Sequence, residues 1–282
     1  MKTAIVVDSG SNYFNEGINQ AGLYAIPLQI IEGETSYLES IEISVDEVND
    51  KMRRGIRVQT SLPILGEIES LFKKIKDDGY DQILAIPITT GLSGTIQAMI
   101  SAASFADIAF DYFDCFTTMH IELYCGLTAR RLLNDGHTVD EVKVILNDIV
   151  DHSNTFIIPD DLKHLSAGGR LSPLAAKLGG LLRIKPILHL DRSTKGIIDP
   201  FDKVRTMSRA LERVVTAFEE EGVDENYQIT LADVDNEKDA VQMEKLLKET
   251  FPKTEVVRIP LISTVSAHVG IGTIALQYFK KI

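Results

Sequence analysis

Residues 89–95, with the sequence TTGLSGT, combine side chains and glycines suited to binding chemistry. They follow the apolar run 83–88 and precede a segment rich in helix-forming residues, which predicts a strand, a turn and a helix. The start of a helix has unpaired N–H groups and a partial positive charge. The hydroxyls of Thr90 and Ser93 add hydrogen-bonding groups, and Gly94 lets a ligand approach the backbone closely. These features predict a site for a carboxylate or a phosphate.

Two sharper interpretations of the same stretch fail. A nucleophile elbow requires the pattern G-x-S-x-G, but residues 91–95 end in Thr95. A phosphate loop requires a lysine after its last glycine, and none follows Gly94. A purely structural role stays open as well, because serine and threonine cap helices routinely.

Thr60 and Ser61 form a second hydroxyl-rich turn before a predicted helix. Apolar residues at helical spacing over 64–75 predict that helix. If the strands before both turns belong to one parallel sheet, their ends meet at the edge where such sheets bind ligands. The sequence therefore predicts that Thr60, Ser61 and Ser93 converge.

Strands and helices alternate through the first half of the chain, which predicts an α/β fold with a parallel sheet. The further predicted strands are 2–7, 23–31 with an interruption at Pro27, and 109–112, and the further helices begin at Ser44 and cover 119–134 and 139–151. Asp8 follows the first strand, where its carboxylate could line a site or cap the next turn; we favour the cap. Ser44 with Glu47 forms a capping box.

The second half of the chain is predicted to form a separate α/β domain. Its boundary lies near residues 154–159, giving domains 1–153 and 154–282. Predicted elements are a strand pair at 185–190 and 196–198, a helix over 203–221, and a β-α-β unit at 228–232, 237–250 and 255–259. His268 lies among small residues, and a lone histidine is more often structural than catalytic.

Residues 163–189 contain no Asp or Glu but five basic residues, although the whole chain has a net charge of −12. Arg170, Lys177 and Arg183 lie among leucines at helical spacing. One interpretation is a basic amphipathic surface for an anionic partner or a membrane face. The alternative is a core helix with solvated basic side chains.

Composition narrows the function classes. The negative charge argues against broad nucleic-acid binding. Two cysteines exclude a disulfide framework and a cysteine-based zinc set, and no metal-ligand spacing occurs, so no metal or cofactor is expected. No apolar stretch is long enough to cross a bilayer, and a cytoplasmic location is expected.

Taken together, the motifs resemble the DegV family, which includes the fatty-acid-binding components of bacterial fatty acid kinase. The matching segments are Asp8-Ser9, Thr60-Ser61-Leu62-Pro63, Gly91-Leu92-Ser93-Gly94-Thr95, Asp161-Leu162-Lys163-His164-Leu165, Gly168-Gly169-Arg170-Leu171, Lys185-Pro186-Ile187-Leu188, Lys203-Val204-Arg205-Thr206, and His268 with Gly270 and Gly272. Their order and spacing hold along essentially the whole chain.

The resemblance implies a three-layer α/β/α domain followed by a two-layer α/β domain, with a fatty acid in a tunnel between them. It implies that the ligand, a palmitate- or oleate-like acid, contacts Thr60, Ser61, Thr90, Ser93, Gly94 and His268. It also implies a carrier that has no nucleotide site and presents the acid to a separate ATP-dependent kinase for acyl-phosphate formation. Arg170, Lys177 and Arg183 would dock the kinase or transiently touch a membrane. The alternative is an acyl hydrolase or transferase that uses Ser93 and His268.

Overall fold

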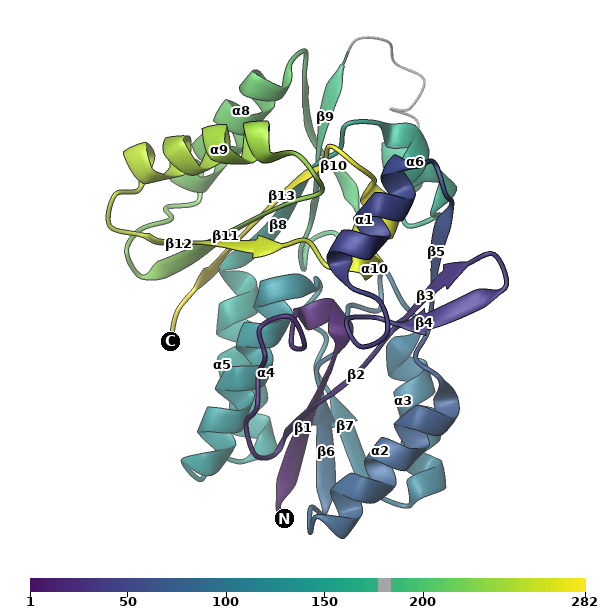
Figure 1. Ribbon diagram of the computed structural model, residues 1–282. Helices are drawn as coiled ribbons and strands as arrows, with labels where there is room; N and C mark the ends of the chain where they lie inside the picture. The colour runs from purple at the N-terminus through teal and green to yellow at the C-terminus, as the bar shows by residue number, and fades with distance from the viewer. Residues whose placement is uncertain (177–183) are drawn as a thin grey trace.

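The computed structural model describes residues 1–176 and 184–282, and the strands in these ranges form three sheets (Figure 1). The strands are β1 (Thr3–Asp8), β2 (Leu23–Ile26), β3 (Gln29–Glu32), β4 (Thr35–Leu38), β5 (Val58–Ser61), β6 (Gln82–Ala85), β7 (Ala109–Tyr112), β8 (Ser153–Ile158), β9 (Lys185–Leu190), β10 (Asp199–Val204), β11 (Tyr227–Asp233), β12 (Glu255–Pro260) and β13 (Ile274–Lys280). The helices are η1 (Ser9–Ser11), α1 (Val45–Arg53), α2 (Leu65–Asp77), α3 (Thr95–Ala106), α4 (Met119–Asn134), α5 (Val139–Asp151), α6 (Leu162–Ala167), α7 (Pro173–Ala176), α8 (Met207–Glu220), α9 (Glu237–Thr250) and α10 (Ser263–Val269).

The first sheet has the strand order β2-β1-β6-β7, and all its neighbouring strands are parallel. Successive residues of β1 point to opposite faces, so Val6 packs with α2 and α3 while Ile5 and Val7 pack with α4 and α5. A strand covered on both faces favours a run of apolar residues, which in β1 covers the four positions between Thr3 and Asp8. The predicted parallel α/β architecture is confirmed.

The second sheet has the order β10-β9-β8-β13-β11-β12 and is mixed, with a parallel pair at β11 and β12. Helices α8 and α9 pack on one face around Phe218 and Leu231. The predicted β-α-β unit is confirmed, but the prediction of a strand at 196–198 is wrong. That segment belongs to a longer turn, in which the Gly196 N–H donates to the Asp191 carbonyl, and the strand itself is β10.

A small antiparallel sheet, β4-β3-β5, stands at the carboxyl edge of the parallel sheet (Figure 1). The strand predicted at 23–31 is divided between two sheets at Pro27, which lacks an N–H for a strand ladder. Immediately after it, the Leu28 N–H donates to the Ser9 hydroxyl. The prediction that Thr60 and Ser61 form a turn is therefore wrong, because both belong to strand β5. The condition that the strand before them belongs to the parallel sheet is not met either, since Thr60 pairs with Ile30 in the small sheet.

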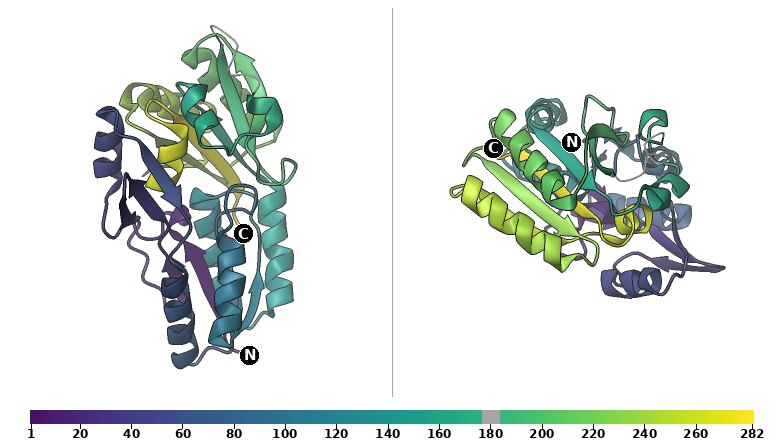
Figure 2. Two further views of the ribbon diagram at one scale, coloured as in Figure 1. Left: turned by 90° about the vertical axis from the view of Figure 1, so that its right-hand side faces the viewer. Right: turned by 90° about the horizontal axis from the view of Figure 1, so that it is seen from above.

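Helix α10 packs between α1, α6 and β5, and Figure 2 shows it beside α1 and the small sheet. Ala267 contributes to the apolar cluster that includes Ile30 and Val48. This helix could not be predicted from the sequence. It is short, and it is followed by Gly270, whose φ is 82°. It brings His268 to the end of β5.

Local capping agrees with the sequence. Ser44 and Glu47 form the predicted capping box of α1, and Asp8 caps η1 by accepting the Gly10 N–H. No helix within residues 1–176 and 184–282 is long and apolar enough to cross a bilayer.

Candidate functional site

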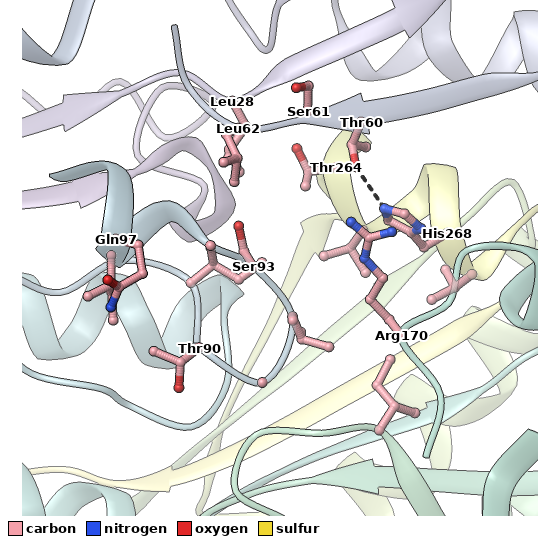
Figure 3. Close-up of a pocket in the computed structure, with 18 residues that line it drawn as sticks. Leu28, Thr60, Ser61, Leu62, Thr90, Ser93, Gln97, Arg170, Thr264 and His268 are labelled. Atoms are coloured by element: carbon pink, nitrogen blue, oxygen red, sulfur yellow. Dashed lines mark hydrogen bonds between the residues drawn. The ribbon is translucent and has the colours of Figure 1, made fainter. Parts of the chain in front are cut away.

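A cavity of about 650 Å³ lies where the end of β5, the turn before α3 and helix α10 meet. This volume is typical of small-molecule sites, which span roughly 300–1,000 Å³. Figure 3 shows the side chains around it. The lining residues are Leu28, Thr60, Ser61, Leu62, Ile88, Thr90, Gly91, Leu92, Ser93, Gly94, Ile96, Gln97, Arg170, Ile198, Thr264, Val265, His268 and Val269.

Thr60, Arg170 and His268 form a polar end of this cavity (Figure 3). His268 Nε2 lies 2.8 Å from the Thr60 hydroxyl oxygen. The Arg170 guanidinium lies beside the imidazole and donates through Nη1 to the Gly168 carbonyl. Among the residues that the structure describes, no carboxylate lines the cavity, so the permanent charge at this end is positive.

His268 is a neutral hydrogen-bonding group at pH 7. Burial lowers the pKa of His268 to about 4, and electrostatic interactions with Arg170 and His164 act in the same direction. Arg170 therefore supplies the charge, while His268 and Thr60 supply neutral hydrogen-bonding groups. A cation beside neutral donors is a suitable partner for a carboxylate.

Glu39 fixes the helix that carries His268. Its buried carboxylate accepts the Thr264 N–H, at the start of α10, at 2.5 Å and also accepts the hydroxyls of Thr264 and Ser9. Burial raises the pKa of Glu39, and these hydrogen bonds oppose that shift. Glu39 thus links the ends of β1 and β4 to α10. Glu39 could not be predicted from the sequence, because nothing in its neighbourhood distinguishes a buried glutamate from a solvated one.

Ser93 lines the cavity but already has a partner. Its hydroxyl lies 2.8 Å from the Thr95 hydroxyl and accepts the Thr95 N–H at the start of α3. Thr90 donates its hydroxyl to Asp114 and points away from His268 in Figure 3. Ser93 therefore lines the cavity and bonds the first residue of α3, although the N-cap of that helix is Gly94.

The fold brings all six predicted fatty-acid-binding residues to this one cavity. Their contact with a ligand stays a prediction. Of the three predicted docking residues, Arg170 lines the cavity, whereas Lys177 and Arg183 lie outside the described residues. Thr264 was missed, although its position four residues before His268 places both on one face of a helix.

Two glycines allow the two halves of the chain to touch beside the cavity. A Cβ on Gly91 would lie 2.4 Å from the Gly196 carbonyl carbon, and a Cβ on Gly196 would overlap the Thr89 side chain. Gly196 also has a φ of 69°, which other residues rarely adopt. The turn 191–198 can therefore lie directly on the turn before α3.

Most of the remaining wall is apolar, including Leu28, Ile96 and Val269. At roughly 30 Å³ for each water-sized group, a volume of about 650 Å³ holds about 20 such groups. An apolar wall with one cationic end suits a long molecule with an acidic head group. Within the described residues, no group of three or more His, Cys, Asp or Glu side chains is placed to hold a metal ion.

Comparison with known proteins gives a consistent result. The sequence model of the DegV family, described as uncharacterised protein, DegV family, matches residues 2–281. A DegV domain-containing protein of Streptococcus pneumoniae is 29% identical over 290 residues, with 100% of both chains covered. Two solved structures also match over 100% of both chains at 27% identity. They are the fatty acid binding DegV family protein of Streptococcus agalactiae, with a TM-score of 0.90, and DegV, a fatty acid binding protein from Bacillus subtilis, with a TM-score of 0.85. This chain belongs to the DegV family.

Proposed function

We propose that this protein binds a long-chain fatty acid in the 650 Å³ cavity, with the carboxylate at Arg170, Thr60 and His268. The observation that carries the proposal is the single cationic, hydroxyl-containing end of an otherwise mostly apolar cavity. Relatives of known structure at 27% identity are described as fatty acid binding proteins, which supports the same ligand class here.

The two ends of the cavity would contribute differently to binding. Burial of each CH₂ group gains about 0.8 kcal/mol, so a palmitate- or oleate-like chain supplies most of the affinity. A hydrogen bond to a charged group contributes about 1.5–3 kcal/mol. The polar end therefore orients the acid, and the apolar wall retains it.

The first test is mass spectrometry of an organic extract of the purified protein, with an unrelated protein from the same host as control. We expect a stoichiometric fatty acid. Arg170→Gln and the near-isosteric Thr60→Val should each weaken oleate binding, by about tenfold for Arg170→Gln. Arg209→Gln, an exposed substitution on α8 away from the cavity, should not weaken it. An empty extract with no uptake of added palmitate or oleate contradicts the proposal.

We further propose that the protein is a carrier without chemistry of its own, which presents the acid to a separate ATP-dependent kinase. The chain contains no phosphate-binding loop, and its motifs resemble the fatty-acid-binding components of fatty acid kinase. With the kinase and ATP present, hydroxylamine should trap the acyl phosphate as a hydroxamate. The lack of any hydroxamate with an active kinase would count against this role.

Kinase docking is tested at Lys177 and Arg183, because a charge reversal at Arg170 would also alter the cavity. The Lys177→Glu/Arg183→Glu variant should retain oleate but lose acyl-phosphate formation. Full activity of this variant would contradict a docking role for the two residues. The hydrolase alternative gains no support, because the Ser93 hydroxyl bonds Thr95 while His268 bonds Thr60.

A further inference from the structure

A second cavity, of about 370 Å³, adjoins the polar end of the first. The two cavities share Thr60, Arg170 and His268, so these three side chains form a wall with a cavity on either side. The other lining residues of the second cavity are Met52, Gly55, Ile56, Arg57, Val58, Gln59, His164, Gly168 and Ala267. It is built from the loop between α1 and β5, the end of α6, and α10.

The permanent charges that line the second cavity are both positive. They belong to Arg57 and Arg170, and among the described residues no Asp or Glu lines this cavity. Within the part of the chain that the structure describes, neither Arg57 nor Arg170 forms an ion pair. In a chain with a net charge of −12, two arginines without an acidic partner on one cavity favour the binding of an anion.

The second cavity differs in character from the first. It is smaller, and it has two arginines, Arg57 and Arg170, beside apolar residues such as Ile56. One guanidinium group can donate hydrogen bonds to two oxygens of the same phosphate. Two arginines that line one cavity can therefore hold a doubly charged tetrahedral anion.

We propose that the second cavity binds a phosphoryl-type oxyanion next to the position of the fatty-acid carboxylate. The placement relative to the carboxylate rests on the proposed function, whereas the anion site itself does not. The phosphoryl group of an acyl phosphate is bonded to a carboxyl oxygen, and the shared wall places the second cavity next to the proposed position of the head group. A free phosphate has the same oxygen chemistry and would use the same side chains.

Arg57 allows a test that leaves the fatty-acid cavity intact, because it lines only the second cavity. Inorganic phosphate is titrated into the purified full-length protein and followed by ³¹P NMR line broadening. We expect the wild-type protein to bind phosphate and Arg57→Ala to bind at least about tenfold more weakly. The matched control is Arg54→Ala, which removes the same charge three residues earlier from a side chain that is 67% exposed and lines neither cavity. It should bind phosphate like the wild type.

Equal weakening in both variants would mean that phosphate responds only to overall charge, and it would overturn the proposal, as would no phosphate binding by the wild type. Mass spectrometry of the same samples reports fatty-acid retention, which Arg57→Ala should keep. A wild-type protein that retains no fatty acid contradicts the proposed function, independently of the phosphate result.

The source of the phosphoryl group is distinguished with an acyl phosphonate, in which a CH₂ group replaces the bridging oxygen. If the site serves an acyl phosphate, the phosphonate binds the wild type more tightly than the fatty acid does, and Arg57→Ala loses that advantage. An Arg57-dependent phosphate signal without any phosphonate advantage assigns the site to free phosphate.

Discussion

At the residue scale, Arg170 and His268 have different roles in the head-group site: Arg170 carries the charge, and His268 is a neutral hydrogen-bonding group. An arginine keeps its charge at any physiological pH, whereas burial and the neighbouring cation keep the imidazole of His268 neutral. A neutral imidazole hydrogen-bonded to Thr60 holds a fixed position without bringing a second charge into a largely buried place. Carboxylate binding at neutral pH would therefore not require prior protonation of His268.

The low pKa of His268 predicts a pH-dependent stability. The pKa is about 4 in the folded protein and about 6.5 when unfolded. Between these values the unfolded chain holds the extra proton, so stability falls as the pH falls from about 6.5 to 4. His268 should cost about 2 kcal/mol between pH 6.5 and 5. Urea denaturation should show a smaller loss over this interval for His268→Gln than for the wild type.

The control is His137→Gln, at a side chain that is 40% exposed. It should keep the wild-type loss between pH 6.5 and 5. Parallel pH profiles for the wild type and His268→Gln would show that His268 is not the group that titrates.

Some site residues could be predicted from the sequence and others could not. Thr60, Ser93 and His268 belong to short motifs with hydroxyls, glycines or an isolated histidine, and all three line the cavity. The position of Arg170 in the cavity wall depends on where its segment folds back, which no local pattern encodes. The same holds for Glu39, whose partners Ser9 and Thr264 are distant in sequence.

At the scale of elements, helix α10 carries two polar residues of the cavity, Thr264 and His268. It is seven residues long, too short to be stable alone, so its partners must hold it. The Glu39 carboxylate accepts hydrogen bonds from the N–H and the hydroxyl of Thr264 in the first turn of α10. Ala267 packs in the apolar cluster that includes Ile30 and Val48. The carboxylate is also at the positive end of the helix. Glu39 thus positions both Thr264 and His268.

Glu39→Gln should disturb α10 without leaving a space. The amide nitrogen of glutamine is a donor, so at least one of the donors from Ser9 and Thr264 would lose its acceptor. An unsatisfied buried donor costs about 1–3 kcal/mol. We expect this loss in urea denaturation, together with weaker oleate binding because Thr264 and His268 shift.

Glu42→Gln is the matched control, since Glu42 accepts the Leu38 N–H on the same turn but is exposed. It should leave oleate affinity unchanged. Wild-type affinity in Glu39→Gln, despite reduced stability, would contradict the positioning role and leave Glu39 as a purely structural residue.

The parallel sheet and its helices could be predicted because their patterns are local. The apolar run of β1 and the capping box of α1 each lie within a few consecutive residues. The small antiparallel sheet was missed because its strands are only four residues long, and because β5 pairs with β3 across the intervening strand β4 and helix α1. The break at Pro27 was visible, but its consequence, a move into another sheet, depends on pairing that is not local.

At the scale of the whole molecule, the cavity exists because its two halves make contact at very short range. The parallel sheet contributes the turn before α3, and the six-stranded sheet contributes the turn 191–198. Gly91 and Gly196 meet where these turns cross, and Ile198 lines the cavity just beyond. Arg192 adds an ion pair to Asp151 across the same junction. The sequence showed the glycines but not that they face each other.

Gly196→Ala should therefore damage both stability and binding. Its Cβ would overlap the Thr89 side chain, so the turn 191–198 must move away from the cavity. Gly222→Ala is a control with nearly the same backbone, with a φ of 72° against 69°, but with nothing within 4 Å of the added Cβ. Both variants bear the cost of an alanine in the left-handed backbone conformation, about 1–3 kcal/mol.

The difference in their free energies of unfolding, measured by urea denaturation, isolates the contact with Thr89. We expect Gly196→Ala to be the less stable variant and to retain less oleate. Equal stability and equal oleate retention would mean that the crossing of the two turns does not hold the cavity together.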